Sequence, residues 1–224
     1  MALIDKTYFK GNRFIPNLNE AEPNNRLQED LMTLMQQSDK DVLSLAFGFE
    51  MWEDFKQFIN ENGGIKEETP QNYKDVVNGK TYQKDGKTLR WNGILETNPK
   101  ASLLADIVCY QYHNNNVTQT TENGQVMIGG KLGDKASSVP KIIECWNSFV
   151  EKFNGGYRDS PSGFTKDGKP YWVLKGGIDY YGIFPRQSGE VSLIQFLADN
   201  KADYPLLQEE IEFVGFQKKN SFGL

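Results

Sequence analysis

The first third of the chain carries apolar residues at helical spacing. Positions i, i+4, i+7 and i+8 predict a helix over residues 24–37, with one apolar face formed by Leu27, Leu31, Leu34 and Met35. Ser38, with Asp41 three residues later, has the pattern of a helix N-cap, so we expect a second helix from Ser38 to about Asn60. Gly63-Gly64 would end it, and the two helices would form a hairpin.

A β-hairpin is expected over residues 80–91. Asp85-Gly86 favours a two-residue turn, because both positions of that turn need positive φ. Pairing around this turn sets Tyr82 opposite Leu89 and Lys80 opposite Trp91.

The second half of the chain alternates helical and turn-rich segments. Asn98-Pro99 predicts the start of a helix, and Pro140 predicts another that ends at Gly155-Gly156. Residues 117–137 are rich in Thr, Gly and Ser and are interpreted as a long loop or a flexible hairpin. Residues 157–190 have turn-rich β character, and a short helix is expected over about 192–200.

The expected fold class is α+β, a helical body with β-hairpins and extended N- and C-terminal arms. Residues 1–22 are expected to be an extended arm, and residues 23–224 a single domain with the long loop at 117–137 and a C-terminal tail from about 201. In the arm, Phe9, Phe14 and Ile15 lack a sustained period. Their apolar groups need a surface, which either the arm's own domain or a neighbouring chain could supply.

Charge and length narrow the function classes. The chain has 25 basic and 30 acidic residues and a net charge of −5, which disfavours tight binding to nucleic acid. No apolar run approaches the roughly 18 residues of a membrane span, and the first residues lack the pattern of a signal peptide, so no membrane partner is expected. Cys109 and Cys145 are expected to be buried free thiols rather than a disulfide, which suits a reducing interior.

Candidate chemistry is sparse. The single histidine, His113, is interpreted as a helix-capping or exposed residue. One His and two Cys offer too few soft ligands for a zinc site. Gly129-Gly130-Lys131 lacks the ending of a phosphate-binding loop. We therefore expect no catalytic residue, no metal and no cofactor, and a protein that is not an enzyme.

Aromatic residues are the remaining functional signal, with 14 Phe, 10 Tyr and 4 Trp. Those on the strands and turns could stack on sugars, anchor a protein interface or simply fill a core. The candidate interface residues are Phe9, Phe14, Ile15, Tyr82, Trp91, Val117, Thr118, Val126, Trp172, Phe184, Phe216 and Phe222.

Several segments together carry a family resemblance. They are residues 2–9 (ALIDKTYF) with 15–17 (IPN), 43–52 (LSLAFGFEMW), 78–82 (NGKTY), 117–124 (VTQTTENG) and 136–150 with its Trp146-Asn147. The set resembles structural neck proteins of tailed bacteriophages, particularly the head-to-tail connector or ring proteins of crAss-like phages and related prophages.

The resemblance implies a virion structural protein, made in the host cytoplasm, that forms a homo-oligomeric ring, commonly a dodecamer. Such a ring binds the portal protein and other neck or tail proteins, and extends a channel through which DNA passes without tight binding. A tail terminator, tail completion or baseplate role stays open within the same class. A carbohydrate-binding module that uses the aromatic hairpins is the alternative from another class.

Overall fold

The computed structural model describes residues 2–15, 18, 25–97, 100–115, 118–121, 124–127, 139–155, 163–164, 170–171, 189–208 and 216–219. Over these residues the fold is α+β, as the sequence predicts. The α-helices are α1 (Asn25–Phe47), α2 (Phe49–Phe55), α3 (Gln71–Asn78), α4 (Leu103–Asn115), α5 (Val139–Asn154) and α6 (Leu193–Asp199). The 3-10 helices are η1 (Lys6–Tyr8), η2 (Gly11–Arg13), η3 (Lys56–Phe58) and η4 (Lys201–Asp203).

The described strands form two-stranded antiparallel pairs, each made of strands adjacent in sequence. They are β1 (Lys80–Lys84) with β2 (Lys87–Trp91), β3 (Leu95–Thr97) with β4 (Lys100–Ser102), β5 (Thr118–Thr121) with β6 (Gly124–Met127), and β7 (Gly163–Phe164) with β8 (Pro170–Tyr171). Because each pair closes locally, the sheets do not organise the domain, and the helices form its centre.

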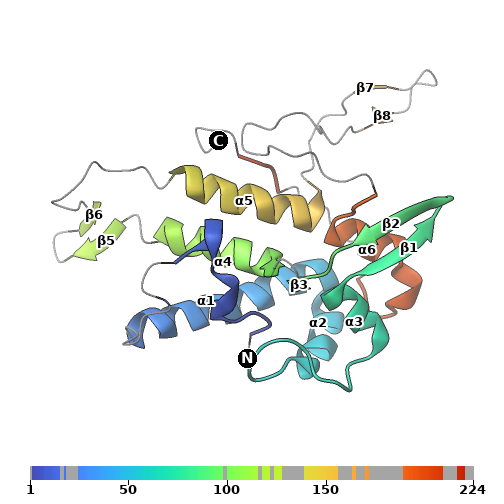
Figure 1. Ribbon diagram of the computed structural model, residues 1–224, viewed down its shortest axis with the longest axis horizontal. Coiled ribbons are helices and arrows are strands. Elements are labelled where there is room, and N and C mark those ends of the chain that lie inside the picture. The colour runs from blue at the N-terminus through green and yellow to red at the C-terminus, as the bar shows by residue number, and fades with distance from the viewer. Residues whose placement is uncertain are drawn as a thin grey trace.

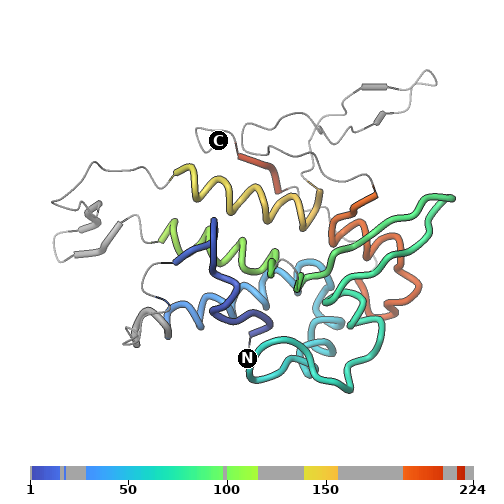
Figure 2. The backbone as a smooth tube through the Cα atoms, in the orientation of Figure 1, coloured from blue at the N-terminus to red at the C-terminus, as the bar shows by residue number. Residues whose placement is uncertain are grey.

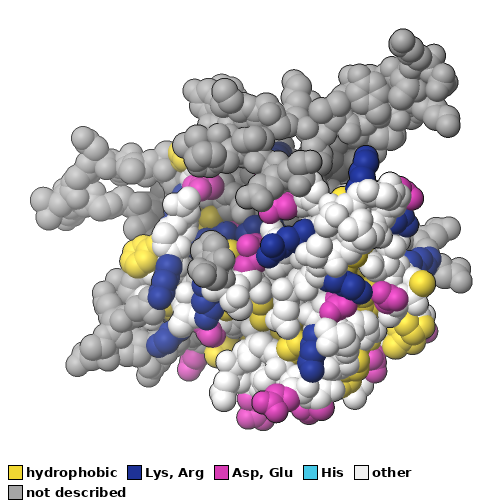
Figure 3. Space-filling view, turned by 45° about the vertical axis from the view of Figure 1, so that its right-hand side comes forward, with side chains coloured by type: hydrophobic (Ala, Val, Ile, Leu, Met, Phe, Trp, Pro, Cys, Tyr) yellow, Lys and Arg dark blue, Asp and Glu magenta, His cyan; other side chains and the backbone are white. Residues whose placement is uncertain are grey.

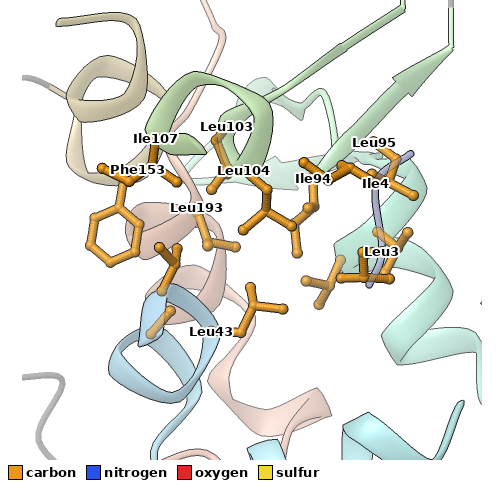
Figure 4. Packing of buried hydrophobic residues seen from close by; sticks show 14 of the residues in the cluster. Leu3, Ile4, Leu43, Ile94, Leu95, Leu103, Leu104, Ile107, Phe153 and Leu193 are labelled. Atoms are coloured by element: carbon orange, nitrogen blue, oxygen red, sulfur yellow. The ribbon is translucent and has the colours of Figure 1, made fainter. Parts of the chain in front are cut away.

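Helix α4 lies between α1 and α5 and packs against both (Figure 1). Its first seven residues, Leu103–Cys109, are all buried, which is the pattern of a helix covered on every side. Leu104 and Ile107 meet Leu43 of α1, Phe153 of α5 and Leu193 of α6 in one apolar cluster (Figure 4).

The break between the first helices is not where the sequence analysis put it. Helix α1 runs through Ser38 without interruption, and the chain turns instead at Gly48, whose φ is 82°. Ser38 does not cap a helix, because its hydroxyl donates to Gln111 Oε1 on α4 at 2.9 Å. The predicted hairpin of helices over 24–37 and 38–60 is therefore wrong.

The hairpin β1–β2 confirms its prediction in detail. Lys80 pairs with Trp91 and Tyr82 with Leu89. Asp85 and Gly86 have φ values of 51° and 74°, as the turn requires.

The other predicted helix ends agree in part with the structure. Helix α5 has Pro140 in its first turn and stops at Gly155, whose φ is 82°. Residues 192–200 hold α6, with the Ser192 hydroxyl accepting from the Gln195 N–H. The predicted start at Asn98-Pro99 is wrong: residues 100–102 form strand β4, and α4 begins at Leu103, where Ser102 Oγ accepts from the Leu104 N–H.

The N-terminal segment does not extend away from the domain. It lies across the helical body (Figure 2), with Leu3, Ile4, Phe9, Ile15 and Leu18 at most 2% exposed. The arm's own domain is thus the surface that covers its apolar groups. The described residues 2–15 and 18 are therefore docked on the helical body, which is the first of the two surfaces that the sequence analysis left open.

The C-terminal tail is also docked where it is described. Tyr204 and Leu207 are buried, and Gln208 bonds the carbonyls of Phe47 and Leu45 at the end of α1. Within the predicted loop at 117–137, the described residues form the β5–β6 hairpin, which agrees with the hairpin alternative.

Cys109 and Cys145 form a disulfide that joins α4 to α5. Their Cα atoms are 6.1 Å apart, and both side chains are buried. The prediction of free thiols is wrong, because pairing depends on which positions face each other when two helices pack, and sequence spacing does not show this.

Candidate functional site

Four of the candidate interface residues lie in the core instead of on the surface. Phe9 and Ile15 are fully buried, Trp91 is 2% exposed and Tyr82 is 9% exposed. The two hairpin rings pack on Phe196 of α6, with centroid distances of 5.7 Å for Tyr82 and 6.1 Å for Trp91. Since buried rings give no stacking platform, these two do not form a sugar-binding surface.

The hydrogen bonds of these hairpin rings point inward as well. The Tyr82 hydroxyl donates to Asp199 Oδ2 at 2.6 Å, and Trp91 Nε1 donates to the Val76 carbonyl at 2.8 Å. Burial, with Asp199 nearby, raises the pKa of Tyr82 above its ordinary value. Both polar groups are satisfied within the chain, which is how core aromatics behave.

The other candidates divide into surface, partly buried and undescribed residues. Phe14 is 50% exposed, and Phe216 is half-buried against α5. Thr118 and Val126 lie on the paired strands β5 and β6. Val117, Trp172, Phe184 and Phe222 lie outside the described residues.

Of the five exposed large hydrophobic side chains among the described residues, four lie at two separate places, and the fifth, Met32, lies on α1. Phe14, at the end of η2, lies beside the first turn of α5, where Val139 is 42% exposed and Lys141 Nζ donates to the Phe14 carbonyl at 2.5 Å. We call Phe14 and Val139 the α5 patch. The second place is where residues after η4 cross the end of α1. Phe49, at the start of α2, is 75% exposed there, and Leu206 is 40% exposed.

We call Phe49 and Leu206 the α2 patch. Figure 1 shows the first turn of α5 and helix α2 toward opposite ends of the helical body. On the face shown in Figure 3, basic and acidic side chains lie among small apolar areas. Phe14 of the α5 patch is one of the candidate interface residues, whereas Phe49 of the α2 patch was missed because it lies in a helical apolar pattern that predicts a core position.

The strongest polar cluster surrounds Asp106, whose side chain is 1% exposed. Arg13 forms an ion pair with one carboxylate oxygen, while Ser148 Oγ at 2.8 Å and Lys152 Nζ at 3.0 Å contact the other. The Ser148 hydroxyl donates to the carboxylate, so it is not arranged as a nucleophile with Lys152 as its base. The cluster fastens the N-terminal segment to α4 and α5.

A second buried carboxylate belongs to Asp39 on α1. One oxygen accepts from the Leu3 N–H at 2.5 Å, while the other is buried without a hydrogen-bond partner. Burial raises the pKa of Asp39 to about 7, although the Leu3 N–H opposes that shift. Above about pH 7 the Asp39 carboxylate is charged while one of its oxygens stays buried without a hydrogen bond, so its contact with the N-terminal segment becomes less favourable.

His113 lies half-buried in the last turn of α4, on Tyr112 and near Lys141. Burial, with the nearby Lys141 charge, lowers its pKa below the ordinary value. Its Nε2 is buried with no hydrogen-bond partner, so it is neither exposed nor part of a catalytic set with Cys109, which is disulfide-bonded.

Within the described ranges, no three His, Cys, Asp or Glu side chains gather as a metal ion would require. None of the described helices combines the length and apolar character of a membrane span. Comparisons with protein-family models, with curated proteins and with solved structures found no match to this chain.

Proposed function

We propose that the protein is a ring-forming structural subunit of a phage neck, a head-to-tail connector that joins portal and tail and extends the DNA channel. The observation that carries the proposal is the presence of two different exposed apolar patches, the α5 patch and the α2 patch. A closed ring needs a heterologous interface, in which one surface of each subunit meets a different surface of the next.

The sequence resemblance supports the same class of function. The segments 2–9 and 43–52 that carry it hold much of the core, including Leu3, Phe9 and Phe47. The net charge of −5 suits a channel wall that DNA passes without being held, because phosphate repels an acidic surface.

Covalent and polar ties between the helices also support a structural role. The disulfide joins α4 to α5, and the Asp106 cluster joins η2 to both helices. A rigid subunit loses less conformational entropy when it assembles.

The test is the oligomeric state of the purified protein, by native mass spectrometry and negative-stain microscopy. The proposal expects closed rings of one stoichiometry, twelve on the family resemblance. A chain that stays monomeric at every concentration, and with portal or tail proteins added, would overturn it.

A further inference from the structure

The β1–β2 hairpin projects from the helical body, with its turn at the outer end (Figures 1 and 2). Its apolar side chains, Tyr82, Leu89 and Trp91, lie on one face, because residues paired directly or at alternate positions of an antiparallel ribbon share a face. This face is fixed to the body, since Tyr82 and Trp91 pack on Phe196. The hairpin is therefore a ribbon that is anchored on one face and exposes the other.

The outward face of the hairpin carries hydrogen-bond donors and no large apolar side chain. Thr81 pairs with Arg90 on this face, and Gln83 pairs with Thr88, and all four are exposed. Side chains of these types contact phosphate oxygens in complexes with nucleic acid. A protein partner would instead need an apolar or aromatic anchor at the centre of the contact. The exposed face therefore suits a phosphate backbone better than a protein surface.

The turn of the hairpin adds two cations. Lys84 and Lys87 are exposed and pair directly across the strands on either side of the turn. Like charges placed opposite each other destabilise a ribbon, so this pair costs stability unless an anion lies beside it. Lys80, at the base, has carboxylate oxygens at 3.0 and 3.4 Å, but the ion pairs among the described residues do not include Lys84, Lys87 or Arg90. These three cations are therefore available to an anionic partner.

The hairpin is also basic within an acidic chain. Residues 80–91 hold three lysines, one arginine and one aspartate, a net charge of +3, so the rest of the chain carries −8. A polyanion that the remaining surface repels would meet attraction at this element. Because each copy would neutralise only a few phosphates, such a contact is weak and depends steeply on salt. This fits DNA that passes without being held.

We propose that the outward face and turn of the β1–β2 hairpin contact the phosphate backbone of double-stranded DNA, with Lys84, Lys87 and Arg90 as the cations. The contact is independent of base sequence, because phosphates carry no sequence information. The inference rests on the proposed function, since a DNA channel is what brings a duplex to the hairpin. In a ring, every copy adds the same weak contact to the passing duplex.

Fluorescence anisotropy of a labelled DNA duplex of mixed sequence, titrated with the full chain at several salt concentrations, tests the contact. The hairpin variant combines Lys84→Gln, Lys87→Gln and Arg90→Gln. Its matched control makes the same charge change at exposed lysines outside the hairpin, Lys6→Gln, Lys10→Gln and Lys40→Gln. We expect the hairpin variant to bind at least about tenfold more weakly than the wild type at about 50 mM salt, and the control to stay within about twofold. The slope of log K against log salt should become shallower by about 2.7 for each copy in contact, as three lost phosphate contacts require.

Equal DNA binding by the hairpin variant and its control would overturn the proposal, and the cations would then only keep the edge of the hairpin from pairing with other chains. Loss of ring formation by the hairpin variant, with DNA binding unchanged, would also overturn it, because the hairpin would then contact an acidic protein surface. Since all the substituted side chains are exposed, both variants should keep a thermal midpoint within about 2 °C of the wild type.

Native mass spectrometry of the same samples separates this inference from the proposed function. Rings whose DNA binding does not depend on the hairpin would refute only the hairpin contact. Monomers whose DNA binding does depend on the hairpin would refute only the ring.

Discussion

The buried carboxylate of Asp39 should make the stability of the protein depend on pH in a specific way. Its pKa is raised from 3.8 to about 7 in the folded chain, whereas the unfolded chain ionises it at its ordinary value. Well below pH 3.8 the carboxyl is protonated in both states, so it makes no contribution to the pH dependence of stability there. Between pH 3.8 and about 7 the folded state keeps the proton on Asp39, whereas the unfolded state has released it. The free energy of unfolding therefore falls as pH rises through this range.

The size of the effect follows from the shift. One proton gives a slope of about 1.4 kcal/mol per pH unit, so the full loss is at most about 4 kcal/mol above neutral pH. Asp39→Asn keeps the shape and an oxygen for the Leu3 N–H, but removes the charge. Relative to the wild type, this variant should therefore gain stability as pH rises from 4.5 to 8.

The assay is urea denaturation of both proteins across that pH range under non-reducing conditions. Asp41→Asn, two residues away on the exposed side of α1, is the matched control and should shift stability by under about 0.5 kcal/mol. A difference between wild type and Asp39→Asn that stays constant with pH would refute the reasoning.

Three further predictions concern the disulfide, the Asp106 cluster and the β1–β2 hairpin. Replacing Cys109 and Cys145 with Ala should lower the free energy of unfolding by about 3–4 kcal/mol in urea titrations, because the disulfide closes a loop across 36 positions; alkylation of two thiols in the unreduced wild type would contradict it. Asp106→Ala should cost about 2–3 kcal/mol in the same titration, since it removes the buried carboxylate that accepts from Arg13, Ser148 and Lys152, and a loss below about 0.5 kcal/mol would argue against the cluster. Gly79→Ala should lower the thermal midpoint far more than Gly86→Ala: both have positive φ, but a Cβ at Gly79 would meet the Trp91 carbonyl oxygen at 2.5 Å, whereas the space at Gly86 is open. Equal losses at the two glycines would contradict this packing.

Local chemistry made some elements predictable from sequence. The β1–β2 register follows from Asp85-Gly86, because a two-residue turn fixes every pair beyond it. The ends of α5 and α6 follow from Pro140, Gly155 and Ser192, whose effects act within one helical turn.

Elements that depend on distant partners could not be predicted in the same way. Ser38 has the local pattern of an N-cap, but Gln111 supplies its hydrogen-bond partner and lets α1 continue. Tyr82 and Trp91 have the composition of surface aromatics on a hairpin, yet Phe196, far along the chain, covers them. The exposed patches depend on the same long-range packing, since a helical pattern does not show which apolar position is left uncovered.

The central claim, a ring built from two different patches, is tested most directly by mixing two variants. Phe14→Ser damages only the α5 patch, and Phe49→Ser damages only the α2 patch. Met32→Ser, at a residue 49% exposed in the middle of α1, is the matched control.

Native mass spectrometry of each variant and of their equal mixture is the decisive measurement. In a heterologous ring, each patch variant alone should fail to form rings, the mixture should give dimers that join the two intact patches, and Met32→Ser should form rings like the wild type. Rings formed by Phe14→Ser or Phe49→Ser alone at wild-type yield would contradict the account.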